Sequence, residues 1–134
     1  MIALDTSVAV AAFASWHEAH TLAIDALGPR PSLPAHCAIE TFSVLTRLPP
    51  PHRAPAKIVS EFLQARFLEP YLTIPEPAYR DLIHEAARFG MTGGAIYDAL
   101  IAATARHAEA TLLSLDSRAA SVYRRLGIDF ELLG

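Results

Sequence analysis

The 134-residue sequence predicts an α/β domain, in which a parallel sheet is covered by helices on both faces. Short apolar runs alternate along the chain with longer segments of helical pattern, and this alternation is typical of parallel strands joined by helices. Hydrophobic residues form 52% of the chain and charged residues 19%, a balance that supports a packed core and excludes a disordered chain. Because a chain of this length holds one domain, we expect residues 1–134 to fold as a single unit.

The first part of the chain predicts one strand followed by two helices. Met1 to Leu4 is a short apolar run, and the capping cluster Asp5-Thr6-Ser7 after it favours a buried helix at Val8 to Ala14. Ser15 and Glu18 have the spacing of a capping box, which predicts a second helix that ends at Gly28-Pro29.

The middle of the chain predicts two short strands, at Ser32-Leu33 and at Tyr71 to Ile74, and three helices. Pro34 suits the start of a helix over Ala35 to Leu48, and Pro77 suits the first turn of a helix that runs to Phe89. The third helix, Ala54 to Leu68, is amphipathic, and its apolar face is formed by Ile58, Phe62, Ala65 and Leu68.

The last third of the chain contains the most apolar helix, which follows Gly93-Gly94 and runs from Ala95 to about His107. Thr111 to Leu115 then predicts a strand, Asp116 to Arg125 a helix, and Ile128 to Leu132 a last strand. The complete chain therefore predicts about five short strands.

Two acids, Asp5 and Asp116, stand directly after predicted strands and before helices. In open parallel sheets, ligands bind beyond the carboxyl ends of the strands, where the strand order reverses, so both positions favour a functional site. Both residues equally suit the N-cap of the following helix, and the sequence leaves the two roles open.

Two further acids lie within predicted helices. Glu40 shares a polar stripe with His36, Ser43 and Arg47, so its alternative role is on a solvated face with a Glu–Arg contact. Asp98 interrupts an otherwise apolar helix, so its carboxylate needs a partner or an open cavity. Its place in the first turn also permits a favourable interaction with the helix dipole.

Together, these four acids predict a divalent-cation site. Clustered carboxylates repel one another and raise one another's pKa, so they are stable when protonated or when a cation is present. An oxygen-only ligand set favours Mg²⁺, with Mn²⁺ as a substitute, over Zn²⁺. Mg²⁺ held by a few carboxylates keeps water ligands, orients a phosphate and neutralises the charge on a leaving oxygen, which suits phosphodiester hydrolysis.

The acids lie in four segments: Ile2 to Ser7, Ala38 to Leu48, Gly93 to Ala102, and Thr111 to Arg118. In their residues and their order, these segments resemble the PIN-domain ribonucleases, specifically the VapC-type toxins of bacterial toxin–antitoxin pairs. The resemblance covers nearly the whole chain, and the third segment is its most specific part. Ser114 stands where relatives often carry threonine, and both residues supply a hydroxyl group. The Pro49-Pro50-Pro51-His52 loop departs from the common helix-hairpin tip and leaves the substrate contacts open.

The resemblance implies a PIN-like three-layer sandwich with strand order 3-2-1-4-5, in which the first and fourth strands are neighbours. It implies that the catalytic and metal-binding residues are Asp5, Glu40, Asp98 and Asp116. Asp5 and Asp98 would be the central metal ligands. Asp116 would complete the site directly or through water, and Glu40 would bind the metal or position a water. Ser7, or less favourably Thr6, would support Asp5 by hydrogen bonding, and Ser114 would be a further supporting hydroxyl.

The same resemblance implies an endoribonuclease toxin that cuts loops of transfer or ribosomal RNA and that a cognate VapB-like antitoxin holds inactive. It also implies a homodimer within a larger toxin–antitoxin assembly. The single cysteine, Cys37, suits the cytosol. No basic stretch precedes an apolar one at the N-terminus, and apolar runs such as Val8 to Ala14 are shorter than the ~20 residues that span a bilayer. We therefore expect a cytoplasmic protein with no membrane contact.

Two other functions remain as alternatives. One is a catalytically inactive PIN module that binds RNA or protein partners, against which the complete set of acids argues. The other is a phosphotransfer receiver domain, which needs an acidic pair after the first strand and a lysine near the last. Here Asp5 is followed by Thr6-Ser7, and the only lysine, Lys57, lies in mid-chain.

The remaining charged and aromatic residues are explained by ordinary structural roles at the surface or in the core. The formal charge of -3 argues against a basic surface that coats nucleic acid, although acids committed to a metal would not oppose an RNA substrate. His17 and His20, beside Trp16, lack the His-Glu-x-x-His spacing, so we assign them to a surface helix. We assign aromatic residues such as Tyr97 and Tyr123 to the core. Four arginines suit either phosphate contacts or solvated helix ends: Arg47, Arg118, Arg124 and Arg125.

Overall fold

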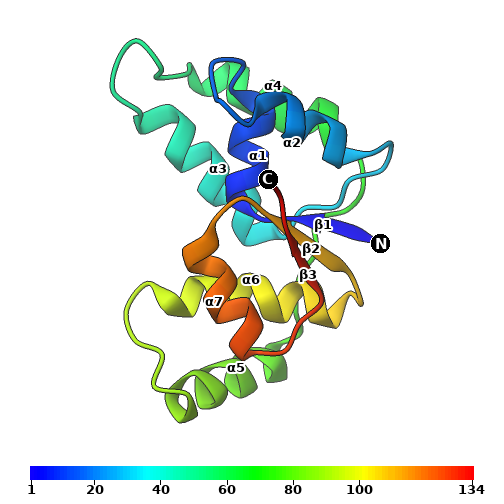
Figure 1. Ribbon diagram of the computed structural model, residues 1–134, viewed down its shortest axis with the longest axis vertical. Coiled ribbons are helices and arrows are strands. Elements are labelled where there is room, and N and C mark those ends of the chain that lie inside the picture. Colours follow the sequence, from blue (N-terminus) through cyan, green and yellow to red (C-terminus); the bar gives the residue numbers. More distant parts are fainter.

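The computed structural model describes residues 1–134 and contains three strands and seven helices (Figure 1). The strands are β1 (Ile2–Leu4), β2 (Thr111–Ser114) and β3 (Phe130–Leu132). The helices are α1 (Thr6–Phe13), α2 (His20–Leu27), α3 (Ala35–Arg47), α4 (Ala56–Arg66), α5 (Glu76–Arg88), α6 (Ala95–His107) and α7 (Ser117–Arg125). None of these helices is both long and apolar enough to span a membrane.

The three strands form a parallel sheet in the order β1-β2-β3. Ala3 of β1 lies opposite Leu112 of β2, and Leu112 lies opposite Phe130 of β3. The backbone N–H of Asp5 continues this pairing, since it donates to the carbonyl oxygen of Leu113 at 3.0 Å. The carboxyl ends of β1 and β2 therefore meet at one edge of the sheet, the edge at which Asp5 and Asp116 follow them.

The expectation of about five strands is wrong. The segments at Ser32-Leu33 and Tyr71 to Ile74 each form only an isolated parallel bridge, Ala3 with Ser32 and Pro34 with Leu72. Prolines flank both segments, and proline has no N–H to donate to a neighbouring strand, so neither ladder extends beyond its bridge. With three strands in the sheet, the five-strand order 3-2-1-4-5 is not confirmed.

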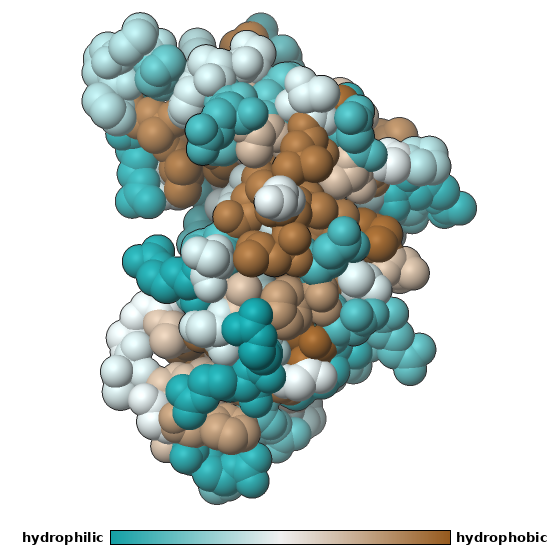
Figure 2. Space-filling view, viewed as in Figure 1, coloured by the Kyte–Doolittle hydropathy of each residue, from teal (hydrophilic) through white to brown (hydrophobic).

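Helices cover the sheet on both sides. Figure 1 shows α1, α2, α3 and α4 on one side and α5, α6 and α7 on the other. The core between them is rich in alanine, and the alanines of α1 and α6 that face the sheet have no exposed surface, including Ala9, Ala99 and Ala102. Such small side chains let both helices pack closely on the strands. In the same view, hydrophobic residues gather over the middle of the surface, with hydrophilic residues above and below them (Figure 2).

The predicted capping box is wrong. Helix α2 begins at His20, and its N-cap residue, Ala19, makes no side-chain capping bond. The backbone N–H of Ala19 donates instead to the Nδ1 atom of His17 at 3.0 Å. Residues 14–19 thus form a turn, and His17 lies in this turn rather than on a surface helix.

The buried face of α4 also differs from the predicted one. Val59 and Leu63 are buried, whereas Ile58 and Leu68 are exposed. Apolar residues lie on more than one side of this helix, and packing against α3 and Phe13 selects the side that carries Val59, Leu63 and the half-buried Phe62. The Phe13 and Phe62 rings meet edge to face at 5.2 Å. The remaining helices begin and end within two residues of their predicted bounds.

Two leucines of similar sequence context test this packing. Leu63 is 7% exposed, and Leu68, just beyond the helix, is 82% exposed. Leu63→Ala is expected to lower the free energy of unfolding by about 2–4 kcal/mol, because it leaves a cavity in the core, whereas Leu68→Ala should change it by less than about 0.5 kcal/mol. Urea unfolding followed by circular dichroism measures both values. Equal losses in the two variants would contradict the placement of α4.

Candidate active site

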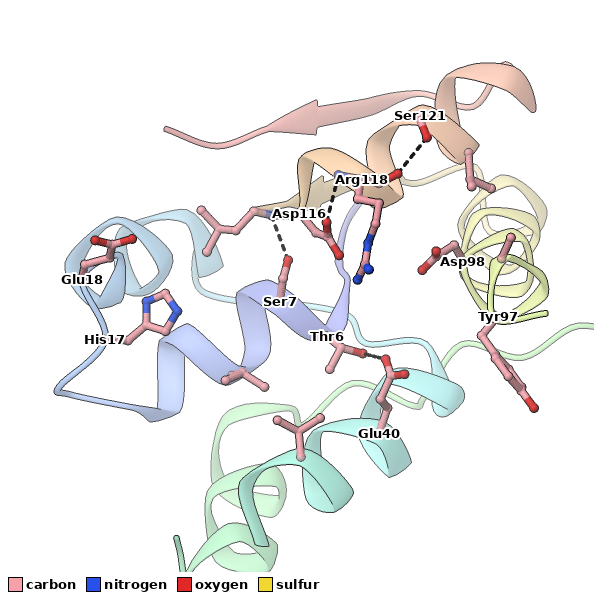
Figure 3. A pocket seen from close by; sticks show the side chains of 16 residues that line it. Thr6, Ser7, His17, Glu18, Glu40, Tyr97, Asp98, Asp116, Arg118 and Ser121 are labelled. Atoms are coloured by element: carbon pink, nitrogen blue, oxygen red, sulfur yellow. Dashed lines mark hydrogen bonds between the residues drawn. The ribbon is translucent and has the colours of Figure 1, made fainter. Parts of the chain in front are cut away.

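A cavity of about 1020 Å³ opens beyond the carboxyl ends of β1 and β2. Its walls come from α1 and the turn after it, α3, the start of α6 and α7, and α3 also contacts α6 directly. Its polar lining includes Thr6, Ser7, Glu40, Asp98, Asp116 and Arg118 (Figure 3). The cavity therefore lies beyond the carboxyl ends of the strands, where open parallel sheets bind their ligands.

Asp5 does not line the cavity but lies beneath it, with 2% of its surface exposed. Its Oδ1 atom caps α1, accepting from the backbone N–H groups of Ser7 at 3.0 Å and Val8 at 3.4 Å. Oδ1 also accepts from the hydroxyl group of Ser7, so Ser7 rather than Thr6 hydrogen-bonds Asp5. The other oxygen, Oδ2, accepts from the hydroxyl group of Tyr123 at 2.9 Å.

Burial raises the pKa of Asp5, and the neighbouring hydroxyl groups of Ser114, Ser7 and Tyr123 oppose this rise. Burial also raises the pKa of Tyr123, which keeps its phenol protonated and able to donate. The sequence assigns Tyr123 to the core, and its ring is indeed fully buried, but its hydroxyl group serves the site. The only feature of the sequence that could have indicated this role is general, because the hydroxyl group of any buried tyrosine needs a polar partner.

Asp116 caps α7 with one oxygen and leaves the other free. Its Oδ1 atom accepts from the backbone N–H groups of Arg118 at 2.9 Å and Ala119 at 3.2 Å. Its own backbone N–H donates to the buried hydroxyl of Ser114 at 3.0 Å. Because only Oδ1 is used for capping, Oδ2 remains available to the cavity that Asp116 lines. The capping role and a role in the cavity are thus compatible.

Glu40 faces the cavity from α3 and is held there by one hydrogen bond, while a histidine ring lies near its other oxygen without bonding it. The Thr6 hydroxyl donates to its Oε1 atom, and the Nε2 atom of His36 lies 3.8 Å from its Oε2 atom. The His36 ring stacks on the ring of Tyr97 at 5.3 Å, and Tyr97 is exposed at the cavity rather than part of the core. No ion pair joins Glu40 to Arg47, so the predicted Glu–Arg contact is wrong.

Asp98 enters the cavity from the first turn of α6. Burial raises its pKa, and the negative charges of Asp116, Glu40 and Asp5 raise it further, while Arg118 lowers it. The charges of all three other predicted site acids therefore act on the pKa of Asp98. The structure brings the four carboxylates into one electrostatic group, although they come from distant parts of the chain.

The chemistry of this group fits a divalent cation. All of its potential ligands are carboxylate oxygens, which Mg²⁺ and Mn²⁺ prefer, and a dication would relieve the repulsion that raises the pKa of Asp98. As the side chains stand, no three His, Cys, Asp or Glu groups in the chain lie close enough together to hold one ion. The fit therefore rests on the charge and type of the ligands.

Arg118 is the one arginine that lines the cavity. Figure 3 shows its side chain reaching into the space between Asp116 and Asp98. It forms no ion pair with either acid, so its guanidinium group is free to bind another anion. By contrast, Arg124 lies over the ring of Phe130, and Arg125 donates to the carbonyl oxygen of Phe89. The sequence does not distinguish Arg118 from these neighbours.

Comparisons with known proteins agree with this architecture. The PIN domain family matches residues 2–125. Ribonuclease VapC40 of Mycobacterium tuberculosis is 49% identical over 133 residues, which is 99% of each chain. At this identity and coverage the relationship extends along the whole fold and includes every wall of the cavity.

Two solved structures share the fold at low sequence identity. VapC20 of M. tuberculosis, a sarcin–ricin-loop-cleaving toxin, superposes with a TM-score of 0.70 at 18% identity over 96% of each chain. The VapBC2 complex of Rickettsia felis, bound to a DNA fragment from its promoter, gives a TM-score of 0.69 at 17% identity over 100% of each chain. With the family match and the full-length relative, these likenesses lead to one assignment: the chain belongs to the PIN-domain family, among its VapC-type ribonucleases.

Proposed function

We propose that this protein is the toxin of a toxin–antitoxin pair and acts as a Mg²⁺-dependent endoribonuclease, for which Mn²⁺ can substitute. The observation that carries the proposal is the cavity at the end of the sheet, which Glu40, Asp98 and Asp116 line, and in which the charges of Asp116, Glu40 and Asp5 act on Asp98. The 49% identity to a ribonuclease over the full chain supports the same activity.

In this proposal, Asp5, Asp98 and Asp116 hold the cation, and Glu40 either ligates it or positions a water. A bound Mg²⁺ would supply Lewis acidity toward the phosphate and its attacking water. The chain's own groups prepare the site for this role. Ser7 and Tyr123 orient the Asp5 carboxylate from opposite sides, and Thr6 holds Glu40 at the cavity wall.

Arg118 is suited to bind the phosphate group of the RNA. A guanidinium group offers paired N–H donors that match phosphate oxygens, and here it lies beside the acids without an acidic partner of its own. Its positive charge would offset the negative field that the carboxylates present to an approaching RNA.

The proposed substrate is an unpaired stretch of RNA, such as a loop of transfer or ribosomal RNA. Bases in single-stranded loops are free to enter a cavity, whereas those of an A-form duplex are stacked and paired. The shared fold with VapC20, which cleaves the sarcin–ricin loop, agrees with this class of substrate.

We further propose a VapB-like antitoxin that inhibits the enzyme, and a homodimer within the toxin–antitoxin assembly. The shared fold with the VapBC2 complex supports an antitoxin partner. One observation supports the alternative function, a module that binds RNA or protein without cutting: no three acids lie close enough together, as the side chains stand, to hold one ion. Cleavage and metal binding separate the two functions.

Asp98→Asn is expected to reduce RNA cleavage by at least about 100-fold, because it removes a proposed metal ligand from the centre of the acid group. The measurement is a time course of total RNA fragmentation with Mg²⁺ or Mn²⁺, and with EDTA as the metal-free reaction. Asp81→Asn, a matched change of an exposed residue on α5, should cleave as the wild type does. Metal-independent cleavage, or equal cleavage by Asp98→Asn, would refute the proposal. Failure of the wild type to cut or to bind Mn²⁺ in calorimetry would favour the inactive module.

The same variant has an opposite effect on stability. The raised pKa of Asp98 means that the folded protein holds this proton more tightly than the unfolded chain does, in which the pKa is 3.8. The ionised carboxylate therefore costs stability as pH rises above that value. In EDTA at pH 7, Asp98→Asn should raise the melting temperature by about 1–4 °C. At pH 3.5 the difference should vanish, and a lower melting temperature at pH 7 would contradict the repulsion.

Arg118→Gln is expected to raise the KM for RNA by about 10- to 100-fold, with a smaller change in kcat, because it removes a charge-assisted contact to phosphate. The slope of log RNA affinity against log salt concentration should become shallower by the amount that corresponds to about one phosphate contact. Arg124→Gln, on the same helix but outside the cavity, is the matched control and should keep the wild-type KM. Unchanged KM and salt dependence in Arg118→Gln would exclude a phosphate contact.

A further inference from the structure

An exposed aromatic stack lies beside the cavity. Trp16, the only tryptophan of the chain, is 47% exposed in the turn between α1 and α2. Its ring stacks on that of His52 with their centroids 4.0 Å apart and their planes at 28°. His52 lies in the loop between α3 and α4, so the stack joins two loops that are distant in the sequence.

This stack lies at the end of the cavity away from the four candidate site acids, and a further acid, Glu18, lines the cavity at this end. Along α1 the cavity is lined by Thr6 and then by Val10 one turn later, and along α3 by Glu40 and then by Val44. Both helices thus run from the acidic end toward the two loops. His17, next to Trp16 in the sequence, lines the cavity at the far end (Figure 3). Thr6 and Phe13, the two ends of α1, are seven helical steps of about 1.5 Å apart, so α1 itself extends roughly 10 Å from the acidic end, and the turn that carries Trp16 follows it.

The surroundings of Trp16 suit a nucleobase better than a protein partner. The polar residues of the two loops include Ser15, His17, Glu18, His52 and the exposed Arg53, and the exposed prolines Pro49, Pro50 and Pro51 lie in the second loop. A single flat ring among polar groups offers a base the π-face that it needs for stacking. A protein partner generally requires a larger, contiguous apolar patch.

We propose that Trp16 is a stacking site for an unpaired nucleobase of the RNA, with His52 supporting the indole ring from its other side. The proposal deepens the ribonuclease function proposed above and rests on it. Because the length of α1 separates the stack from the acidic end, the base belongs to a nucleotide that flanks the cleaved bond. The site contributes to RNA binding and to the choice of cleavage position, and it takes no part in the chemical step.

The single tryptophan makes the site directly observable. In Asp98→Asn, which prevents turnover, titration with hexa-adenylate RNA is expected to quench the tryptophan fluorescence in a saturable manner, because a stacked base contacts the indole. Inorganic polyphosphate carries the charge without the bases and should leave the fluorescence unchanged. Absence of quenching by the RNA, or equal quenching by polyphosphate, would overturn the stacking proposal.

Kinetics of the otherwise unchanged enzyme provide a second test. Trp16→Ala should raise the KM for a cleaved RNA by about 5- to 50-fold with kcat and Mn²⁺ affinity unchanged, and Trp16→Phe should restore most of the loss. Tyr79→Ala is the matched control, since Tyr79 is 45% exposed on α5 and does not line the cavity. An unchanged KM in Trp16→Ala would refute the stacking site while the ribonuclease function stands.

Two further outcomes separate the proposals. Quenching by hexa-adenylate in a protein whose wild type cuts no RNA would support the stacking site and refute the ribonuclease function. If Trp16→Ala keeps full RNA affinity but loses affinity for the protein encoded by the adjacent gene, the exposed indole is a protein contact and the stacking proposal is wrong.

Discussion

The buried carboxylate of Asp5 joins four elements of the fold at the carboxyl ends of β1 and β2. Its backbone pairs with β2, its Oδ1 atom caps α1, and its Oδ2 atom accepts from Tyr123 of α7. Ser7 extends the network, because its hydroxyl group donates to Asp5 and accepts from the backbone N–H of Leu115 at 2.8 Å. A carboxylate without exposure to water requires such partners, so burial of Asp5 constrains how α1, α7 and the two strands meet.

The same arrangement places stability and function in conflict. Burial disfavours the charge of Asp5, and burial together with the other acids disfavours the charge of Asp98. A fold selected for stability alone would replace these acids with neutral residues. Their presence beside an alanine-rich core agrees with a site whose partner is a cation, because the repulsion among the acids of the metal-free protein becomes attraction for a bound dication.

The cavity divides its functions along the length of α1 and α3. One end carries the acids and Arg118, which suit the reacting phosphodiester and its charge. The other end, which His17 and Glu18 line, leads to the loops that carry Trp16 and His52, where the exposed aromatic rings suit stacking. Rigid helices separate the two ends by a constant distance, so a strand bound at the aromatic end would present a defined phosphate to the acidic end.

Local sequence was sufficient for the fold class, for the approximate bounds of every helix except the start of α2, and for the choice of the four candidate acids, because periodicity, most caps and strand-end positions depend on neighbouring residues. Local sequence did not predict that the sheet has three strands rather than five. Whether a proline ends a strand depends on which strand it pairs with, and that pairing is set only in the folded protein. Nor did local sequence predict the buried side of α4, the Tyr123–Asp5 bond or the Thr6–Glu40 bond. These features join residues far apart in the chain, 118 positions in the case of Tyr123 and Asp5, and such contacts exist only after the helices have packed on the sheet.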